Sequence, residues 1–501
     1  VYVGANDGML HAIDADTGVA AAGVELFAYV PGYSARNLND LTNPGYSHET
    51  FVDTVPKIQE AKVNGVWKTV LVGASGNGAQ GAFALDVTDP VAFGPSKVLF
   101  EFSDTDDADF GNVLAAPEIA KLRVGPTTGG GPPIYKYFAV VTGYNNKRVD
   151  VNGHPGADTN VSTDTLNRGV LFLLSLDHPL NTPWVLGTDY YKFKFPASAV
   201  ASPNALGPVT LLPSRSGDRS TAAIYFGDLQ GNLWRFNTTG NDPSAWTPAI
   251  GSVASPLPVF VATDSAGKRQ PITARPELAA GPFGSTLVFF GTGKYLGQSD
   301  VTPPTPPATY PQQSEYALLD TGSSSVITRA SDLVARTATV SGGNVTLTGS
   351  PFSYSGPSAK KGWYVDFPNT AIGERSVTKP AIRTGLLTFT TQTLSADVCG
   401  AGGGYIYQVN ALTGLPYGTA PFGGYTSTVG IPGPPRIVDL TIEAGQTRAT
   451  GEQINKKTQA TLVSGTLGKI DTPGPVIPSK TPPVGRINWR EITNWNDLTG
   501  H

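Results

Sequence analysis

The feature that most constrains the fold of this chain is an internal repeat with the pattern of a β-hairpin. In its first copy the alternating segment Val1–Gly4 is followed by a glycine-centred turn and a second alternating segment, Leu10–Asp14. The segments Ile224–Gly227 and Leu233–Asn237 repeat this order around another glycine, and a Thr-Gly pair closes both copies. Glycine supplies the positive φ angles of a tight hairpin turn, and period-two alternation gives each strand one buried face. Because such a hairpin cannot bury its apolar face alone, the repeat indicates an architecture of packed β units.

Weaker copies of the hairpin occur along most of the chain. They lie at 70–87, at 138–177, from 287 onward and at 404–414, which brings the total to about six units. Their spacing of roughly 60 to 100 residues exceeds the 40–50 residues of a plain propeller blade. We therefore expect an all-β fold, a β-propeller of about six to seven blades with long inserted loops, which explains the pattern better than a sandwich does.

We expect the whole chain, 1–501, to form a single modified β-propeller domain. The residues in excess of plain blades are assigned to loop insertions near 103–135, 144–168, 199–222, 241–275 and 298–315, and 470–501 forms a C-terminal segment. These insertions are where we expect partner contacts, because loops are free to vary while blades are not. Since Val1–Val3 already has the pattern of a strand, we also expect that the N-terminal part of the full-length protein is missing.

Composition supports β structure and narrows the possible functions. The 59 Gly and 42 Pro separate short apolar runs throughout the chain, and only 15% of residues are charged, so we expect little helix. The formal net charge of −4 provides no basic field for nucleic acid, and no apolar run is long enough to span a bilayer. The single cysteine, Cys399, excludes an internal disulfide, fits a small packed side chain at a turn, and is compatible with export.

Two acidic segments are candidate calcium sites. Asp150, Asn152 and Asp158 place oxygen side chains at positions 1, 3 and 9, as a calcium-binding loop does, although Val161 stands where a bidentate Glu belongs. The alternative is a polar, turn-rich loop without a metal. The segment Ser103–Asp109 contains four carboxylates, which repel one another unless a cation or solvent relieves them. It either adds calcium ligands or, as the simpler interpretation, forms a solvated acidic turn.

The sequence does not indicate a catalytic centre. Five scattered His and one Cys cannot supply a zinc-site pattern. His11 lies in a predicted strand beside a turn and His48 in a loop, and no nucleophile motif or paired acid accompanies either of them. The glycines of Gly400–Gly404 are not followed by the Lys-Ser/Thr pair of a phosphate-binding loop. We therefore expect that the chain is not an enzyme.

Several longer strings resemble a known family. The strings Val1–Ala12, Ala82–Thr88, Phe226–Phe236, Gly362–Asp366 and Trp489–Glu491 are similar to the C-terminal β-propeller of the PilY/PilC type IV pilus tip adhesin and biogenesis family. The most specific string is Phe226–Phe236, and the resemblance covers almost the whole chain. It implies an exported, non-enzymatic module at the pilus tip, outer membrane or cell surface. Such a module would support pilus assembly with minor pilins, control retraction and thus twitching motility, and adhere to a host-cell or surface receptor.

The resemblance also implies a calcium loop just before Phe226–Phe236, with acidic ligands at alternate positions. Here Asp218 fits the central ligand, while Ser214 and Ser216 hold the first two places with neutral hydroxyls. Ala222 cannot coordinate where the last Asp belongs. Ligand count and charge predict that this site is degenerate, and that calcium, if the chain binds it, binds at Asp150–Asp158.

Two other functions share the propeller architecture, since a fold does not determine an activity. A quinone-cofactor dehydrogenase resembling the quinoproteins would use an adjacent Cys-Cys disulfide and a calcium-linked acidic pocket, and the lone cysteine argues against it. A glycan-binding lectin propeller would use Tyr and Trp on loops as platforms for sugars, which the 19 Tyr permit without locating a site.

Overall fold

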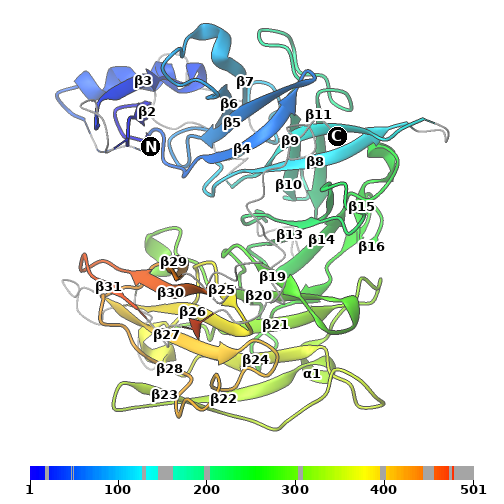
Figure 1. Cartoon of the computed structure of the whole chain (residues 1–501), viewed down its shortest axis with the longest axis vertical. Helices are drawn as coiled ribbons and strands as arrows, with labels where there is room; N and C mark the ends of the chain where they lie inside the picture. Colours follow the sequence, from blue (N-terminus) through cyan, green and yellow to red (C-terminus); the bar gives the residue numbers. More distant parts are fainter. Residues whose placement is uncertain are drawn as a thin grey trace. The chain divides into compact units, whose positions relative to one another are not determined.

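The computed structural model of the chain consists of β-strands joined by turns and loops (Figure 1). The structure describes residues 1–16, 22–46, 48, 50–126, 131–144, 162–196, 204–302, 309–394, 402–443, 456–472 and 477–478. These residues divide into two compact units, each of which is described by itself. Unit 1 takes Val1–Tyr225 and Arg235–Pro256, and unit 2 takes Phe226–Trp234 and the described residues from Leu257 onward.

Unit 1 contains antiparallel sheets in which consecutive strands are neighbours. One sheet has three strands and two sheets have four, which is the meander order of propeller blades. The strands of these sheets are β1 (Tyr2–Gly4), β2 (Leu10–Ile13) and β3 (Glu25–Tyr29); β4 (Lys57–Val63), β5 (Val66–Ala74), β6 (Gly81–Asp86) and β7 (Val98–Ser103); and β8 (Glu118–Gly125), β9 (Ile134–Thr142), β10 (Gly169–Ser175) and β11 (Tyr190–Phe195).

The middle of the chain forms one more sheet in the order β12-β13-β14-β15. Its strands are β12 (Thr210–Pro213), β13 (Thr221–Gly227), β14 (Asn232–Asn237) and β15 (Thr247–Pro248), and β18 (Phe260–Val261) also pairs with β14. The short strands β16 (Ile250–Gly251) and β17 (Pro256–Leu257) pair with each other.

Unit 2 contains a ten-stranded sheet and a smaller four-stranded one. The large sheet has the order β19-β20-β21-β24-β22-β23-β28-β27-β26-β25, so a group of four antiparallel strands lies on each side of the β22–β23 hairpin. The strands are β19 (Glu277–Ala280), β20 (Thr286–Gly291), β21 (Ser314–Asp320), β22 (Val334–Ser341), β23 (Asn344–Thr348), β24 (Gly362–Asp366), β25 (Ala381–Arg383), β26 (Leu386–Thr393), β27 (Gly403–Asn410) and β28 (Gly424–Thr426), followed by β29 (Arg436–Glu443), β30 (Lys456–Ser464), β31 (Ile470–Asp471) and β32 (Ile477–Pro478) in the small sheet.

Helix is scarce in the part of the chain that the structure describes, as predicted. The α-helix found there is α1 (Arg329–Asp332), a single turn. Short 3₁₀ segments occur at Gly32–Thr42, Pro95–Lys97, Pro243–Ala245, Pro282–Gly284, Gln298–Asp300 and Thr370–Ile372. Within the described residues, none of the helices combines the length and the apolar character that a membrane crossing requires. The all-β prediction is confirmed for these residues.

The predicted hairpin repeat is confirmed by the strand pairing. In the first copy β1 and β2 pair in antiparallel register with Tyr2 opposite Ala12, and Gly8 in the turn has a φ of +93°. In the second copy β13 and β14 are neighbours, and their turn contains Gly231 with a φ of +79°. A side chain at either glycine would be strained in this left-handed conformation, which explains why the turns of both copies carry glycine. Leu10 of β2 is fully buried, as the alternation predicts.

Aromatic side chains fill the core of each unit. In unit 1 the ring of Phe102 lies edge-on to the rings of Phe110 and Tyr190, with centroids 5.0 and 5.2 Å apart. In unit 2 the rings of Phe389 and Tyr407 stack at 4.6 Å. Inner strands such as β6 are buried along their whole length, because sheets cover both of their faces. This packing favours rigid sheets that hold the connecting loops in place.

Three of the predicted loop insertions contain strands. β8 lies within 103–135, β12 within 199–222, and β15 to β18 within 241–275. These strands are short or partly exposed, so their alternation is weaker than that of the inner strands. Most of 144–168 and of the segment 470–501 lies outside the described residues. The division into two units does not decide whether 1–501 closes as a single domain, so the domain count stays a prediction.

Candidate functional site

The loop between β12 and β13 in unit 1 contains the residues that the family resemblance assigns to calcium. Protein donors hold the carboxylate of Asp218 there. Its Oδ2 accepts a hydrogen bond from the Tyr135 hydroxyl at 2.6 Å, and its Oδ1 accepts from the Ser220 amide and hydroxyl at 2.9 and 2.7 Å. The hydroxyl oxygens of Ser214 and Ser216 lie 2.6 Å apart, so one donates to the other. The three predicted ligands therefore come close together but are occupied with partners of their own.

A lysine supplies positive charge beside the same loop. Nζ of Lys121 donates to the backbone carbonyl of Asp218 at 2.9 Å and lies 4.6 Å from the centroid of the Tyr135 ring. Lys121 and Tyr135 come from the neighbouring strands β8 and β9. Burial acts to raise the pKa of Asp218, but the hydrogen bonds from Tyr135 and Ser220 outweigh it and lower that pKa to about 2. The Asp218 carboxylate is thus ionised, and hydrogen bonds from protein groups stabilise its charge.

This set of donors does not fit a calcium ion. Calcium takes about six to eight oxygen ligands, several of them carboxylates. The loop offers a single carboxylate at Asp218, two hydroxyls that bond to each other, and the ammonium of Lys121, which repels a cation. The degenerate state of this site stays a prediction, and these contacts give it a physical reason.

The acidic segment after β7 is paired with lysines. Asp107 and Asp109 are only 9% and 7% exposed. Nζ of Lys192 lies 2.8 and 2.7 Å from their carboxylate oxygens, and Nζ of Lys194 lies 2.7 Å from Asp109. The solvated turn expected for Ser103–Asp109 is therefore wrong for these two residues. The lysines on β11, far along the chain, supply the cations that the local sequence lacks.

Two hydroxyl groups complete this network. Ser162 donates to Oδ1 of Asp109 at 2.5 Å, and Tyr190 donates to Oδ2 of Asp107 at 2.7 Å. Burial would raise the pKa of Asp109, but the bonds from the two lysines and Ser162 lower it to about 2. A carboxylate pair with this many donors is a structural cross-link of unit 1.

The other candidate calcium residues, Asp150, Asn152 and Asp158, lie outside the described residues, and so does Cys399. Their predicted roles stay predictions. Within the ranges that the structure describes, no group of three or more His, Cys, Asp or Glu side chains is arranged to hold a metal ion.

The two histidines considered as general bases have polar contacts at the surface of unit 1. Nε2 of His11 lies 2.9 Å from Oδ2 of Asp7, and its Nδ1 lies 3.1 Å from Oε1 of Glu25. The bond to Glu25 is the main cause that raises the pKa of His11. Nε2 of His48 lies 3.4 Å from Nδ2 of Asn6. These contacts join a hairpin turn to its neighbours, which agrees with a structural role for His11.

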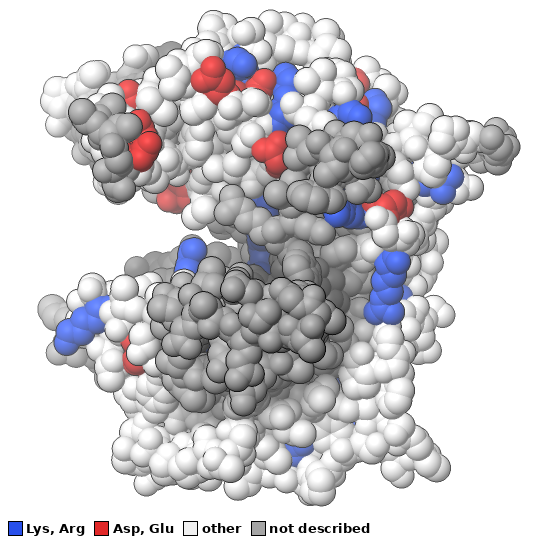
Figure 2. All heavy atoms as spheres, in the orientation of Figure 1, with Lys and Arg blue, Asp and Glu red and all other residues white. Residues whose placement is uncertain are grey.

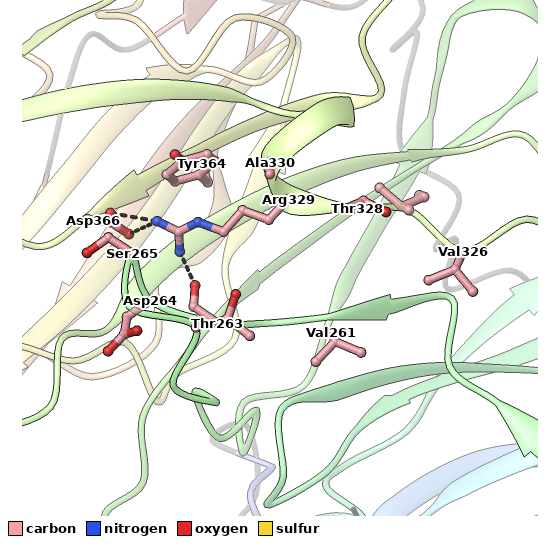
Figure 3. A pocket seen from close by; sticks show the side chains of 12 residues that line it. Val261, Thr263, Asp264, Ser265, Val326, Thr328, Arg329, Ala330, Tyr364 and Asp366 are labelled. Carbon is pink, nitrogen blue, oxygen red and sulfur yellow. Dashed lines mark hydrogen bonds and ion pairs between the residues drawn. The ribbon is translucent and has the colours of Figure 1, made fainter.

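A pocket of about 650 Å³ in unit 2 is the feature that sequence reasoning missed (Figure 3). Nη2 of Arg329 contacts both carboxylate oxygens of Asp366, at 2.8 and 2.7 Å. The guanidinium carbon of Arg329 lies 3.9 Å from the centroid of the Tyr364 ring. Tyr364 and Asp366 belong to the string Gly362–Asp366, so the sequence pointed to this strand. It did not indicate that α1, which carries no motif, would bring Arg329 across it.

Comparison with known proteins places the chain in a family. Residues 1–167 and 192–336, more than half of the chain, match the model of the family described as the PilY1 beta-propeller domain. The chain belongs to the PilY1 β-propeller domain family. This confirms the resemblance that the sequence strings suggested, and it also confirms the β-propeller as the fold class.

Two curated PilY1 relatives match this chain over part of their own length. A type IV pilus biogenesis factor PilY1 homolog of Xylella fastidiosa is 33% identical, over 83% of this chain and 26% of the relative. The type IV pilus biogenesis factor PilY1 of Pseudomonas aeruginosa is 31% identical, over 83% of this chain and 34% of the relative. The chain therefore spans about a third or less of the length of these relatives.

A solved structure agrees with the PilY1 fold. The crystal structure of the Pseudomonas aeruginosa PilY1 C-terminal domain superimposes with a TM-score of 0.63. The match covers 95% of this chain and 92% of that domain, at 23% sequence identity. At this identity the likeness shows the fold alone.

In this PilY1-family chain, the most specific string, Phe226–Phe236, builds a buried turn. Oδ1 of Asp228 accepts the backbone N–H groups of Gln230 and Asn232 at 2.9 and 2.8 Å. Its Oδ2 accepts the side-chain N–H groups of Asn232 and Trp234 at 2.7 and 2.8 Å. A buried carboxylate with four donors fixes the hairpin geometry. The string therefore sets the geometry of this hairpin turn.

Charged side chains are sparse on the face of the molecule shown in Figure 2, where Lys and Arg lie scattered among Asp and Glu. This agrees with the 15% of charged residues and the net charge of −4. Among the described residues on this face, no cluster of one charge sign is visible.

Proposed function

We propose that this chain is the propeller module of a type IV pilus biogenesis factor and that it acts at the pilus tip. The match to the PilY1 beta-propeller domain family over more than half of the chain carries this proposal. The two relatives that bear the name type IV pilus biogenesis factor support it. Pilus biogenesis takes place at the cell envelope, so we also propose export to the outer membrane or cell surface.

The proposal is tested by removing the coding region of residues 1–501 from the chromosome and restoring it on a plasmid. Surface pili are sheared off and the major pilin is quantified by immunoblot, with whole-cell pilin as the control. We expect the deletion to lower surface pilin severalfold and the plasmid to restore it. Unchanged surface pilin in the deletion strain would overturn the proposal.

We further propose that the module controls retraction and adheres to a host-cell or surface receptor. Both functions need a rigid body with exposed loops. The buried aromatic cores and cross-linked carboxylates of each unit support this role. Twitching zones and attachment of cells to glass or epithelial monolayers measure the two functions separately.

The proposed protein partners are minor pilins, and no catalytic activity is part of the proposal. Co-purification of each tagged minor pilin with the full-length factor tests the partnership. If a factor that lacks residues 1–501 still co-purifies with the tagged minor pilins, this module has no role in that contact.

Calcium control through the loop of Ser214, Ser216 and Asp218 is not part of the proposed function. The contacts of Asp218 with Tyr135, and of its carbonyl with Lys121, favour a loop that closes without a metal. Asp150, Asn152 and Asp158 stay the alternative calcium ligands.

A further inference from the structure

We infer that the pocket around Arg329 in unit 2 binds a neutral saccharide. The pocket lies between β18 and the turn after it, the segment leading into α1, and β24 (Figure 3). This inference rests on the proposed adhesive function and names the class of ligand that the receptor would present.

The wall formed by Arg329 is rigid before any ligand arrives. Besides its two contacts with Asp366, the guanidinium donates through Nη1 to the Tyr316 hydroxyl at 2.6 Å and to the carbonyl of Thr263. Asp366 in turn accepts a 2.5 Å bond from Ser314. Only 10% of the Arg329 side chain is exposed. Because these bonds fix the side chains in advance, a ligand loses little affinity to ordering them.

The charges in the pocket disfavour an anionic ligand. Of the residues that line it, the charged ones are Arg329, Asp366 and Asp264. The positive charge of Arg329 is offset by Asp366, whose two carboxylate oxygens both accept from Nη2, and the carboxylate of Asp264 adds a further negative charge. A phosphate or carboxylate would have to break the Arg329–Asp366 pair and leave a partly buried carboxylate unpaired, which is costly. A neutral ligand faces neither penalty.

Residues with hydroxyl side chains line the same pocket. Within the described part of the chain, the hydroxyls of Ser265, Thr328 and Tyr364 have no hydrogen-bond partner. Each hydroxyl both donates and accepts, as the hydroxyls of a sugar do. Val261 and Val326 add apolar surface between them, against which the C–H groups of a pyranose ring can pack. This combination of hydroxyls with a larger apolar surface fits a sugar, which carries both hydroxyl and C–H faces.

The size of the pocket agrees with a small saccharide. A volume of about 650 Å³ lies within the range of roughly 300–1,000 Å³ that is typical of small-molecule sites. Figure 3 shows Thr328 and Val326 on one side of the Arg329 guanidinium and Asp264 and Ser265 on the other.

The test measures binding of methyl glycosides to the purified chain by saturation-transfer NMR and calorimetry. The neutral probes are the methyl glycosides of glucose, galactose, mannose and N-acetylglucosamine, and N-acetylneuraminic acid is the anionic probe. Tyr364→Phe removes one hydroxyl and keeps the ring beside Arg329, whereas Val326→Trp fills the pocket from a residue that is 42% exposed. Tyr295→Phe and Val66→Trp, at side chains that are 50% and 59% exposed elsewhere, are the matched controls.

We expect at least one neutral glycoside to bind saturably. Tyr364→Phe should weaken that binding about five- to tenfold, as loss of one hydrogen bond does, and Val326→Trp should abolish it. The two control variants should bind like the wild type. If Val326→Trp does not fold, as judged by its thermal midpoint, the comparison of Tyr364→Phe with Tyr295→Phe decides.

Three outcomes would overturn the inference: no neutral glycoside binding at millimolar concentration, binding that all four variants retain, or binding of the anionic probe alone. The adhesive function fails by a different measurement. Cells that attach normally without residues 1–501 contradict adhesion by this module, whatever the purified chain binds. Cells that lose attachment while the purified chain binds no neutral glycoside contradict the saccharide site alone.

Discussion

The indole Nε1–H of Trp234 donates a 2.8 Å hydrogen bond to Oδ2 of Asp228, inside the most family-specific string of the chain. Asp228 is 0% exposed and Trp234 is 1% exposed. The same carboxylate also accepts three bonds from Gln230 and Asn232, so it joins the turn to the strand that follows it. These contacts explain why the string is specific to a fold, since Asp228, Asn232 and Trp234 together set the geometry of one hairpin.

Asp228→Asn should destabilise the chain by about 3 kcal/mol. The change replaces an acceptor oxygen by an NH₂ group, which would face the N–H donors of Asn232 or Trp234, so buried donors would lose their acceptor. Trp234→Phe should cost about 2 kcal/mol. Urea denaturation followed by tryptophan fluorescence and circular dichroism measures both. Asp53→Asn, at an exposed carboxylate, is the control and should match the wild type. An unchanged urea midpoint for Asp228→Asn would contradict the structural role of the string.

Glu315 on β21 should make unit 2 less stable at neutral pH than in mild acid. Its side chain is fully buried, and the Ser376 hydroxyl beside it offsets only a small part of the cost of burial. Burial raises the pKa of Glu315 well above its ordinary value. A folded-state pKa above the unfolded one gives stability that is present below the unfolded pKa and is lost as the pH rises toward the folded pKa.

Glutamine is neutral at every pH, so a Glu315→Gln chain takes up no proton at this position when it folds, and its thermal midpoint at pH 7 should be higher. The gain in the free energy of unfolding is about 1.4 kcal/mol for each pH unit between the unfolded-state pKa of Glu315 and pH 7, provided that the folded-state pKa lies above pH 7. Near pH 4, where the carboxyl is protonated in both states, the variant and the wild type should have similar midpoints. A variant that is less stable than the wild type at pH 7 would show that the buried carboxylate is ionised and paired.

The lysine pairs of the acidic segment should be essential to unit 1. Lys192→Met leaves Asp107 and Asp109 with one ammonium fewer in a buried place, and it should destabilise the chain by about 3 kcal/mol. The double variant Lys192→Met/Asp109→Asn should recover part of this loss, because Asp109→Asn removes one of the two buried negative charges. Lys62→Met, at an exposed lysine, is the control. Equal stability of the wild type and Lys192→Met would show that solvent relieves the carboxylates.

The same pairs predict a loss of stability in acid. The pKa of Asp109 is lowered to about 2, below its ordinary value of 3.8. A lowered folded-state pKa gives stability that is present above the unfolded pKa and is lost as the pH falls from about 4 through 2. The thermal midpoint, measured at pH values from 7 to 2, should decrease as the pH drops from about 4 to 2. The decrease should be smaller for Asp109→Asn.

The loop at Ser214, Ser216 and Asp218 should not respond to calcium. Tyr135→Phe should destabilise the chain by about 1 kcal/mol, with or without calcium, because it removes one hydrogen bond to Asp218. Thermal melting of the wild type and of Tyr135→Phe, each in calcium chloride and in chelator, measures these effects. A calcium-dependent rise of the midpoint that Asp218→Ala removes would contradict this expectation. A rise that Asp150→Ala with Asp158→Ala removes would assign calcium to the other loop.

Much of the fold was predictable from the sequence because its signal is local. The pairing of β1 with β2 follows from alternation around Gly8, and the turn of the second copy follows in the same way from Gly231. The outer strands β8 and β12 were assigned to loops, because partly exposed strands alternate less clearly. Short edge strands carry the least sequence signal of a sheet.

The site residues were harder to predict because their partners lie far apart in the chain. Lys192 neutralises Asp107 across 85 positions, and Arg329 reaches Asp366 across 37. The acidic run was visible in the sequence, but the lysines on β11 had no motif to mark them. In the same way, Tyr364 and Asp366 stood out as part of a string, while the chemistry of their pocket depends on a one-turn helix.

The most direct test of the central claim, that this PilY1-family module supports pilus biogenesis, is a count of surface pili in cells that lack residues 1–501. The count is made by electron microscopy in two backgrounds, one with normal retraction and one in which retraction is blocked. We predict fewer pili in both backgrounds and recovery on complementation, because a biogenesis factor acts before retraction. Wild-type numbers of pili in both backgrounds would contradict the account.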